Sequence, residues 1–165
     1  MNYHNITHDD MLNGPGLRVV LWVAGCDHYC HNCQNPETWN PEGGIPFDGD
    51  AKQELKHYLC KEYTAGLTFS GGDPLFFGNR EEVTAIAREV KTYFPKKTVW
   101  CYTGHKWEDV KDLEVVKYID VLVDGEYVEA ERDVNLPWVG SKNQRIINVK
   151  QSLKQDRVVL VNTED

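Results

Sequence analysis

The feature that most constrains the fold is an alternation of strand and helix patterns between residues 17 and 123. Strands are predicted for four runs rich in β-branched and other apolar residues, at 17–23, 65–69, 98–102 and 120–123. Helical patterns separate them at 50–63, 79–94 and 106–117, with Asp50 and Asn79 as expected N-terminal caps. Such alternation is typical of βα units that build a parallel sheet. Beyond residue 125 only short strands are expected, at 145–149 and 157–161.

The chain length limits how this sheet can close. A complete (β/α)₈ barrel needs roughly 200 residues or more, whereas this chain has 165. We therefore expect an α/β fold in a single domain over residues 1–165, arranged as a partial, open (β/α) barrel of the TIM type. Ligands of such sheets bind at the C-terminal ends of the strands. The loops after residues 23 and 69 should therefore meet on one rim.

Charge and hydropathy exclude two classes of partner. The formal net charge is −8, and the basic residues are scattered, with Lys96 and Lys97 as the only basic pair. Nucleic acid binding depends on clustered Lys and Arg, so we expect no nucleic acid partner. No apolar run approaches the roughly 20 residues that span a bilayer, and the polar N-terminus lacks a signal-peptide pattern. These features predict a cytoplasmic protein with no membrane partner.

Three of the five cysteines lie within eight residues, as Cys26, Cys30 and Cys33 in a C-x₃-C-x₂-C spacing. Clustered cysteines in a reducing compartment bind metal or do redox chemistry more often than they form disulfides. Iron–sulfur clusters usually have four thiolate ligands, so three would leave one iron open to a substrate. Zinc is the competing interpretation, because Cys₃His is an accepted zinc set and His28 and His31 lie in the same loop. The spacing alone supports both metals equally.

The remaining cysteines and histidines have simpler interpretations. Structural zinc sites usually combine two separated ligand pairs, which a continuous triad does not provide. We therefore expect His28 and His31 to be ordinary polar loop residues. Cys60 falls in a helical pattern and Cys101 in a strand pattern, so both are expected to be small core residues.

A second candidate site follows the strand pattern at 65–69. There Ser70, Gly71, Gly72 and Asp73 precede Pro74. The two glycines would let the backbone approach a ligand, and the loop could receive the ammonium and carboxylate groups of an amino acid. Alone, such a loop is more often a structural turn. Its placement on the same rim as the cysteines makes a shared site the stronger hypothesis.

At these residues the sequence resembles the radical S-adenosylmethionine superfamily. The superfamily's cysteine motif matches Cys26, Cys30 and Cys33, and its Gly-Gly-Glu motif matches residues 71–73. More closely, the chain resembles the activating proteins of anaerobic ribonucleoside-triphosphate reductases. The shared blocks lie between about residues 2 and 149 and comprise residues 13–16, 26–35, 70–75, 102–104, 121–125 and 140–145.

This resemblance implies a partial barrel of the radical S-adenosylmethionine type. It implies a [4Fe–4S] cluster held by the three cysteines, whose fourth iron is chelated by the methionine amino and carboxylate groups of S-adenosylmethionine. The methionine end would be held by Ser70, Gly71, Gly72 and Asp73, and the adenosine would meet backbone of Asn32, Cys33 and Gln34.

The resemblance also implies a reaction and its partners. One electron, from a flavodoxin-type or other low-potential reductant, would cleave the sulfonium C–S bond and give methionine and a 5′-deoxyadenosyl radical. That radical would abstract hydrogen from a glycine of the large reductase subunit, the protein substrate, and leave a glycyl radical there. The protein would position the cofactors and exclude competing reactions.

Two residues depart from the superfamily pattern. Asn32 stands before the third cysteine, where an aromatic residue is common, which weakens any expectation of stacking on adenine. Asp73 replaces the usual Glu, although the activating proteins tolerate Asp. Neither departure affects the cluster ligands.

Three alternatives stay open at this point. The chain could activate a glycyl-radical lyase, although those activators resemble larger proteins with additional ferredoxin-like cysteines, which are absent here. It could act on a free metabolite, although an open barrel suits a protein substrate better. It could be a non-enzymatic zinc-binding interaction module, which would leave residues 71–73 and the later blocks unexplained. The role of residues 140–145 is left open, and the five tryptophans are expected to be packing residues, at positions 22, 39, 100, 107 and 138.

Overall fold

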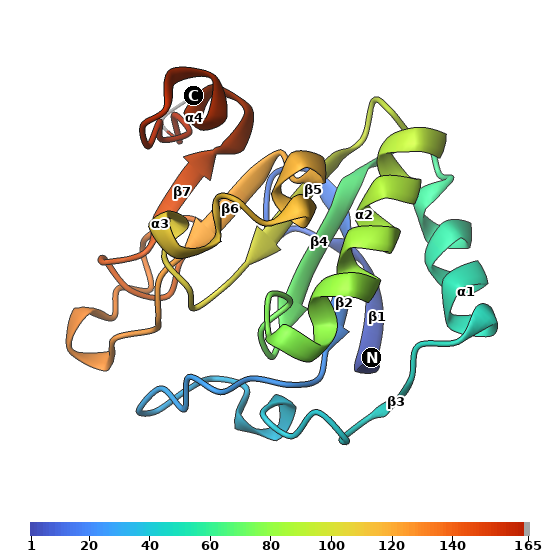
Figure 1. Ribbon diagram of the computed structural model, residues 1–165. Coiled ribbons are helices and arrows are strands. Elements are labelled where there is room, and N and C mark those ends of the chain that lie inside the picture. The colour runs from blue at the N-terminus through green and yellow to red at the C-terminus, as the bar shows by residue number, and fades with distance from the viewer. Residues whose placement is uncertain (164–165) are drawn as a thin grey trace.

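Seven strands form one mixed sheet in the computed structural model, which describes residues 1–163 (Figure 1). The strands, given in chain order, are β1 (Asn2–Asp10), β2 (Leu17–Val23), β3 (Ile45–Pro46), β4 (Thr64–Gly71), β5 (Thr98–Tyr102), β6 (Val121–Asp124) and β7 (Arg145–Asn148). Their spatial order is β3-β1-β2-β4-β5-β6-β7. The α-helices of the described residues are α1 (Gly49–Leu59), α2 (Arg80–Tyr93), α3 (Trp107–Val110) and α4 (Val149–Gln155).

The centre of the sheet consists of β2, β4, β5 and β6, which pair in parallel. The predicted parallel pairing of these four strands is therefore confirmed. Antiparallel strands complete the sheet on both sides, with β1 beside β2, β3 beside β1 and β7 beside β6. The strand order runs from β3 to β7 without closing on itself. The partial, open barrel stays a prediction.

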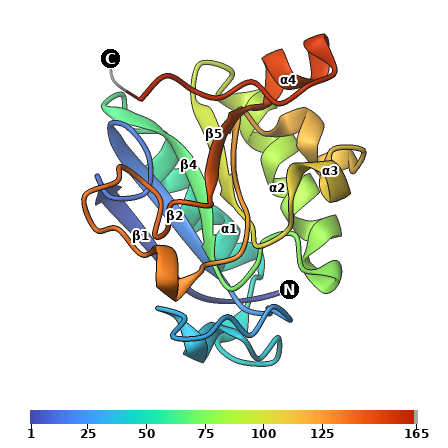
Figure 2. The same ribbon diagram turned by 90° about the vertical axis from the view of Figure 1, so that its left-hand side faces the viewer.

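The main apolar core lies between the sheet and helices α1 and α2. Strand residues that alternate along the chain, such as Val19, Leu21 and Val23 of β2, belong to one buried cluster with Leu55 of α1 and Ile86 of α2. Figure 2 shows both of these helices on one side of the sheet, while residues 125–144 cross its other side. None of the described helices has the length and apolar character needed to cross a membrane.

The opposite face of the sheet is closed near the N-terminal ends of the strands by Arg18, a fully buried side chain of β2. Its guanidinium donates to Thr68 Oγ1 at 2.9 Å and to Thr98 Oγ1 at 2.9 Å, and its other N–H groups meet carbonyl oxygens. A Cβ on Gly14, where φ is +123°, would lie 2.8 Å from Arg18 Cδ. Residues 13–16 therefore pack over Arg18, and this packing requires glycine.

Several predicted elements differ in detail from the structure. Asp48, not Asp50, caps α1 by accepting from Ala51 N. Asn79 does precede α2, but its side chain makes no capping bond. The helix expected at 106–117 is only the short α3, followed by the 3₁₀ turn Glu114–Tyr118. The strand expected at 157–161 is reduced to a single bridge between Ile147 and Leu160.

Candidate functional site

A cavity of about 720 Å³ opens at the C-terminal ends of the parallel strands. It is lined by the cysteine loop, the Gly-Gly loop after β4, residues 102–104 after β5 and the segment 125–140 after β6. The cavity lining includes every predicted site residue except Asn32, namely Cys26, Cys30, Cys33, Gln34, Ser70, Gly71, Gly72 and Asp73. The two candidate sites predicted from the sequence are therefore one site.

The cysteine loop has no regular secondary structure, and specific backbone features shape it. Gly25 N donates to Thr38 O at 2.7 Å and Cys26 N donates to Trp39 O at 3.0 Å, which fix the start of the loop. Tyr29 and Asn32 have φ values of +51° and +56°, and these left-handed residues reverse the chain between the cysteines. Asn32 is exposed at such a turn.

The three thiols are half-buried and free. Burial raises the pKa of Cys26 to about 12, and it also raises the pKa of Cys30. Thiols with raised pKa values are protonated at neutral pH, so a bound cation is needed to hold them as thiolates. Cys33 Sγ accepts from Asn35 N at 3.4 Å, a contact typical of cluster thiolates. The three thiols line the same cavity, and three thiolates are the ligand set that would leave one iron of a [4Fe–4S] cluster open.

The Gly-Gly loop is pressed against the start of the cysteine loop. Gly72 N donates to Val23 O at 2.8 Å and Asp73 N donates to Gly25 O at 2.7 Å. A Cβ on Gly72 would lie 2.5 Å from Gly25 O, and one on Gly71, where φ is +100°, would lie 2.7 Å from Val23 N. Asn79, which is buried, joins the same two loops by donating to Ala24 O and Asp73 O. Only glycine allows this close approach.

The Asp73 carboxylate is 1 % exposed and accepts hydrogen bonds from four groups. The donors are Leu75 N at 2.8 Å, Thr103 Oγ1 at 2.9 Å, Gly104 N at 3.0 Å and His28 Nε2 at 2.6 Å. Burial alone would raise the pKa of Asp73, but the bonds from His28 and Leu75 outweigh it and hold that pKa below its ordinary value. The carboxylate is therefore ionised and fully engaged within the protein.

His28 makes contacts with two carboxylates that the sequence did not predict. Its side chain is 10 % exposed, and its Nδ1 lies 2.9 Å from Glu126 Oε1 while Nε2 bonds Asp73. Carboxylates only accept, so both ring nitrogens donate and the ring is an imidazolium. These bonds, led by that to Asp73, raise the pKa of His28 to about 9. The expectation of an ordinary loop residue was wrong for His28, whereas His31 is exposed as expected.

The engagement of His28 also bears on metal binding. Asp27, His28 and His105 each bring a ligand atom within 4.8 Å of the other two. Because both His28 nitrogens already donate to carboxylates, neither has a lone pair for a metal, and we assign no ion to this group. The same reasoning removes His28 as the fourth ligand of a zinc site built on the cysteines.

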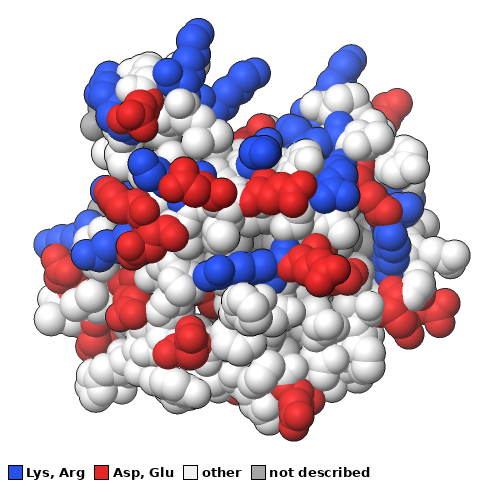
Figure 3. Space-filling model, viewed as in Figure 1, with Lys and Arg blue, Asp and Glu red and all other residues white. Residues whose placement is uncertain are grey.

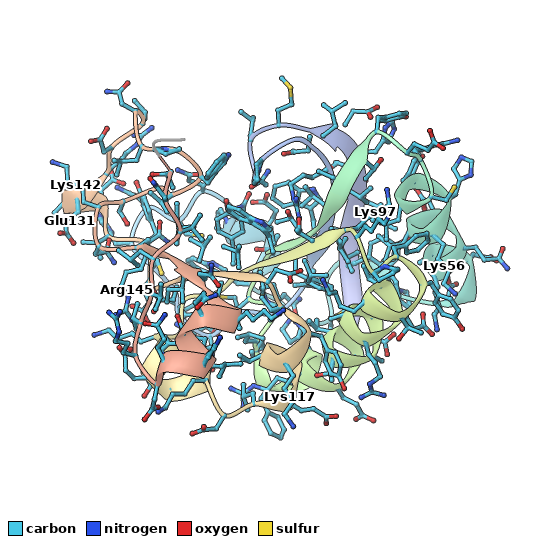
Figure 4. The ribbon with its side chains drawn as sticks, turned by 90° about the horizontal axis from the view of Figure 1, so that it is seen from above. Lys56, Lys97, Lys117, Glu131, Lys142 and Arg145 are labelled. Carbon is cyan, nitrogen blue, oxygen red and sulfur yellow. The ribbon has the colours of Figure 1, made fainter. Side chains whose placement is uncertain are left out.

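The outer wall of the cavity is formed by residues 125–144, which leave the sheet after β6 and return to β7. The segment is held against the sheet by Tyr102, whose hydroxyl donates to Trp138 O at 2.6 Å, and by ring contact of Trp138 with Trp100. Its base is held by Gln144, which bonds Gly140 N and Gly125 O. Figure 4 shows Glu131 and Lys142 together at its outer end. Residues 140–145 therefore maintain the shape of this wall.

The tryptophans and lone cysteines divide between core and surface. Trp100 and Trp107 are buried as expected. Trp22, Trp39 and Trp138 are partly exposed and line the cavity, and Trp39 and Trp138 also pack on the rings of Tyr29 and Trp100. Cys101 is a core residue as expected, whereas Cys60 is exposed at the end of α1 and is not.

Comparison with known proteins agrees with this site. A family model described as a 4Fe-4S single cluster domain matches residues 12–147, which includes the three cysteines and the whole cavity wall except Met11. The class of protein is therefore a single-cluster iron–sulfur protein.

Three curated relatives specify the family. A protein of Enterobacteria phage T4 is 48% identical over 150 residues, which cover 88% of this chain and 93% of the relative. A protein of Vibrio cholerae serotype O1 is 38% identical over 152 residues (88% and 97%), and one of Escherichia coli strain K12 is 35% identical over 154 residues (91% and 100%). Each is named anaerobic ribonucleoside-triphosphate reductase-activating protein. This chain belongs to that family, which confirms the resemblance and the prediction of an activating enzyme, and disfavours the lyase-activator, free-metabolite and zinc-module alternatives.

Proposed function

We propose that this chain generates the glycyl radical of an anaerobic ribonucleoside-triphosphate reductase by reductive cleavage of S-adenosylmethionine. The observation that carries the proposal is the meeting of Cys26, Cys30 and Cys33 with the Gly-Gly loop in one cavity, in a chain of the activating-protein family. The cavity lies at the end of the parallel strands where such sheets bind ligands.

The three cysteines would hold the [4Fe–4S] cluster and leave one iron for the methionine end of S-adenosylmethionine. A bound cluster would supply the electron for reductive cleavage of the sulfonium C–S bond, which would allow hydrogen to be taken from a glycine of the reductase. The protein's part is to position these groups and to limit access of water. The half-buried thiols and the Asn35 N–H on Cys33 Sγ serve that purpose.

S-adenosylmethionine would occupy the rest of the cavity. The volume of about 720 Å³ lies within the roughly 300–1,000 Å³ usual for small-molecule sites. Ser70, Gly71 and Gly72 line it and would meet the methionine end with backbone groups, and Gln34 lines it near the cysteines. Asp73 would act differently from our first expectation. Its carboxylate is already engaged by four donors, so we propose that it orders the loop without touching the methionine.

The segment that carries the cysteines is acidic overall, although His28, held as an imidazolium between Asp73 and Glu126, and Arg132 in the cavity lining add positive charge. The sequence contains no Lys or Arg between residues 19 and 51. In Figure 3 the lower edge of the molecule, where the cysteine loop and β3 lie in Figure 1, shows acidic but no basic side chains. Negative surroundings oppose the addition of an electron and lower a cluster's reduction potential. Sulfonium reduction needs such a potential, and we propose a flavodoxin-type or other low-potential donor in the cytoplasm.

The large reductase subunit would reach the cavity through its open side. Met11 and Leu12, in the turn between β1 and β2, are 68% and 81% exposed, and Val134 on the outer wall is 77% exposed. All three line the cavity, so apolar side chains stand on both sides of its mouth. A flexible glycine-containing segment of the partner could be held between them while its Cα approaches the cofactor.

The direct test of this function is anaerobic reconstitution with iron and sulfide, followed by reduction in the presence of S-adenosylmethionine. The wild type should form 5′-deoxyadenosine, and Cys30→Ala should form none because one cluster ligand is lost. Cys60→Ala is the matched control, since Cys60 is exposed at the end of α1, and it should retain full activity. A wild-type protein that holds zinc, lacks an iron chromophore and forms no 5′-deoxyadenosine would overturn the proposal.

A further inference from the structure

The His28 side chain connects three loops that leave different strands. His28 follows β2, Asp73 follows β4 and Glu126 follows β6, and the imidazole bonds both carboxylates, at 2.6 Å and 2.9 Å. Asp73 extends the connection to β5 through Thr103 Oγ1 and Gly104 N. The C-terminal ends of all four parallel strands are thus joined by one hydrogen-bonded network with an imidazole at its centre.

The structure around the ring is built to hold it. A Cβ on Gly104 would lie 2.6 Å from His28 Cδ2, so the ring packs directly on that glycine. The His105 ring meets it edge-on, with 4.7 Å between the ring centroids. The side chain of Asp73 is 2% exposed, whereas that of Glu126 is 54% exposed. One side of the bridge is therefore buried and fixed, and the other side is open to change.

The open side leads to the outer wall of the cavity. Glu126 is followed by Tyr127, and both residues line the same cavity as Cys30. Glu126 therefore joins the segment 125–144 to the cysteine loop through His28. The same segment carries Val134 at the mouth of the cavity.

We propose that His28 is a positioning residue, which clamps the cysteine loop between Asp73 and Glu126 and thereby aligns the cluster with the Gly-Gly loop and the outer wall. The inference deepens the proposed function and rests on it only for the identity of the bound cluster. His28 touches neither substrate nor cluster in this role. It acts through the placement of Cys26 and Cys30, on either side of it in the chain.

The test compares His28→Gln with His31→Gln in the reconstituted protein. His31 lies in the same loop but is exposed, so its replacement controls for a change of sequence between the cysteines. Glutamine has one donor nitrogen where the imidazolium ring has two on different sides. It therefore cannot reproduce both the bond to Asp73 and the bond to Glu126. Both variants should bind iron like the wild type, because neither removes a cysteine.

Two readouts separate positioning from a merely structural role. In His28→Gln, amide hydrogen exchange over residues 24–35 should be faster than in His31→Gln, and the KM for S-adenosylmethionine should rise about 10- to 100-fold, the usual cost of losing an outer partner of a metal site. The spectrum of the reduced cluster with S-adenosylmethionine should become heterogeneous. Glu126→Gln, which leaves the buried side of the clamp intact, should show the same changes at smaller size.

Three results would overturn the proposal. Unchanged exchange and KM in His28→Gln would show that the clamp positions nothing. Loss of iron from His28→Gln alone would make His28 part of the ligand set. If His28→Gln does not fold, unchanged exchange in Glu126→Gln would decide against the clamp. Hydrogen exchange needs no catalysis, so a wild type that fails to cleave S-adenosylmethionine would overturn the proposed function without deciding this test.

Discussion

Two buried charged groups, Arg18 and Asp73, lie at opposite ends of the parallel strands and are used in opposite ways. Arg18 satisfies its N–H groups with neutral oxygens of the sheet and of the turn before β2, and within residues 1–163 its guanidinium forms no ion pair with a carboxylate. Asp73 accepts hydrogen bonds from the loops after β2 and β5 and from Leu75 N in its own loop. One of these donors, His28, is itself charged. One end is closed by bonds within the sheet, and at the other end the bonds join loops that have no regular secondary structure.

Arg18 and Asp73 differ in whether their hydrogen-bond partners belong to strands or to loops. Bonds to strand backbone, such as those of Arg18 to Leu67 O and Thr98 O, are fixed by the sheet itself. The bonds of Asp73 order loops that have no regular structure of their own, and they lead through His28 to the half-exposed Glu126. Substitutions at Arg18 should therefore affect stability, and substitutions at Asp73 should affect function more.

The largest effect is expected from Asp73→Asn. The amide is similar in size but cannot accept from all four donors, and it removes the charge that faces His28. We expect 5′-deoxyadenosine formation to fall roughly 100-fold in a protein that still folds. The measurement is single-turnover cleavage under reduction, with Asp27→Asn in the same region as a control of unchanged rate. Full activity of Asp73→Asn would contradict the view that Asp73 serves function whereas Arg18 serves stability.

The next effect is expected from Arg18→Met. The apolar side chain leaves several buried oxygens without a donor, and each unsatisfied group costs about 1–3 kcal/mol. We expect the free energy of unfolding to drop by at least about 2 kcal/mol, as measured by anaerobic urea denaturation. Cleavage activity per folded molecule should be retained. A variant of normal stability that has lost activity would place Arg18 in the functional site instead.

A smaller effect is expected from Leu12→Glu at the mouth of the cavity. A charge among the apolar side chains should weaken docking of the reductase segment, so the glycyl radical formed per 5′-deoxyadenosine should fall several-fold. Leu160→Glu is the matched control, because Leu160 is 59% exposed near the C-terminal tail and lies outside the cavity lining. Equal ratios in both variants would show that the mouth is not where the partner docks.

The smallest effect is expected from Cys60→Ser. Cys60 is exposed at the end of α1, where its thiol donates to His57 O of the same helix. Surface substitutions of this kind change stability by less than about 0.5 kcal/mol. Iron content and activity should equal those of the wild type. A loss of iron would mean that a fourth cysteine takes part in the site.

The parallel centre of the sheet could be predicted because β2, β4 and β5 each contain a short run of mostly apolar or β-branched residues, as strands buried on both faces usually do. Strand β1 was missed because it is an edge strand of Asn, His, Thr and Asp in which only Tyr3 and Ile6 are buried. Helix α4 was missed because its polar sequence buries only Val149 and Ser152. Elements that bury little leave little pattern in the sequence.

The cysteines and the Gly-Gly loop could be predicted for a related reason, since cluster ligation and close backbone approach each require particular residue types. The role of His28 could not, because it depends on Asp73 and Glu126, which lie 45 and 98 residues away. Its position two residues after Cys26 was the available signal. That Trp22, Trp39 and Trp138 line the cavity could not be predicted, because they lie on β2, on the turn after Thr38 and on the segment 125–144, which only the fold brings together.

The most direct test of the account follows hydrogen from the partner to the cofactor. The anaerobic reductase would be produced with glycine deuterated at its α-carbon, mixed with this protein and S-adenosylmethionine, and reduced. The account predicts that 5′-deoxyadenosine gains one deuterium as a glycyl radical appears in the electron paramagnetic resonance spectrum. Unlabelled 5′-deoxyadenosine, formed without a radical on the reductase, would contradict it.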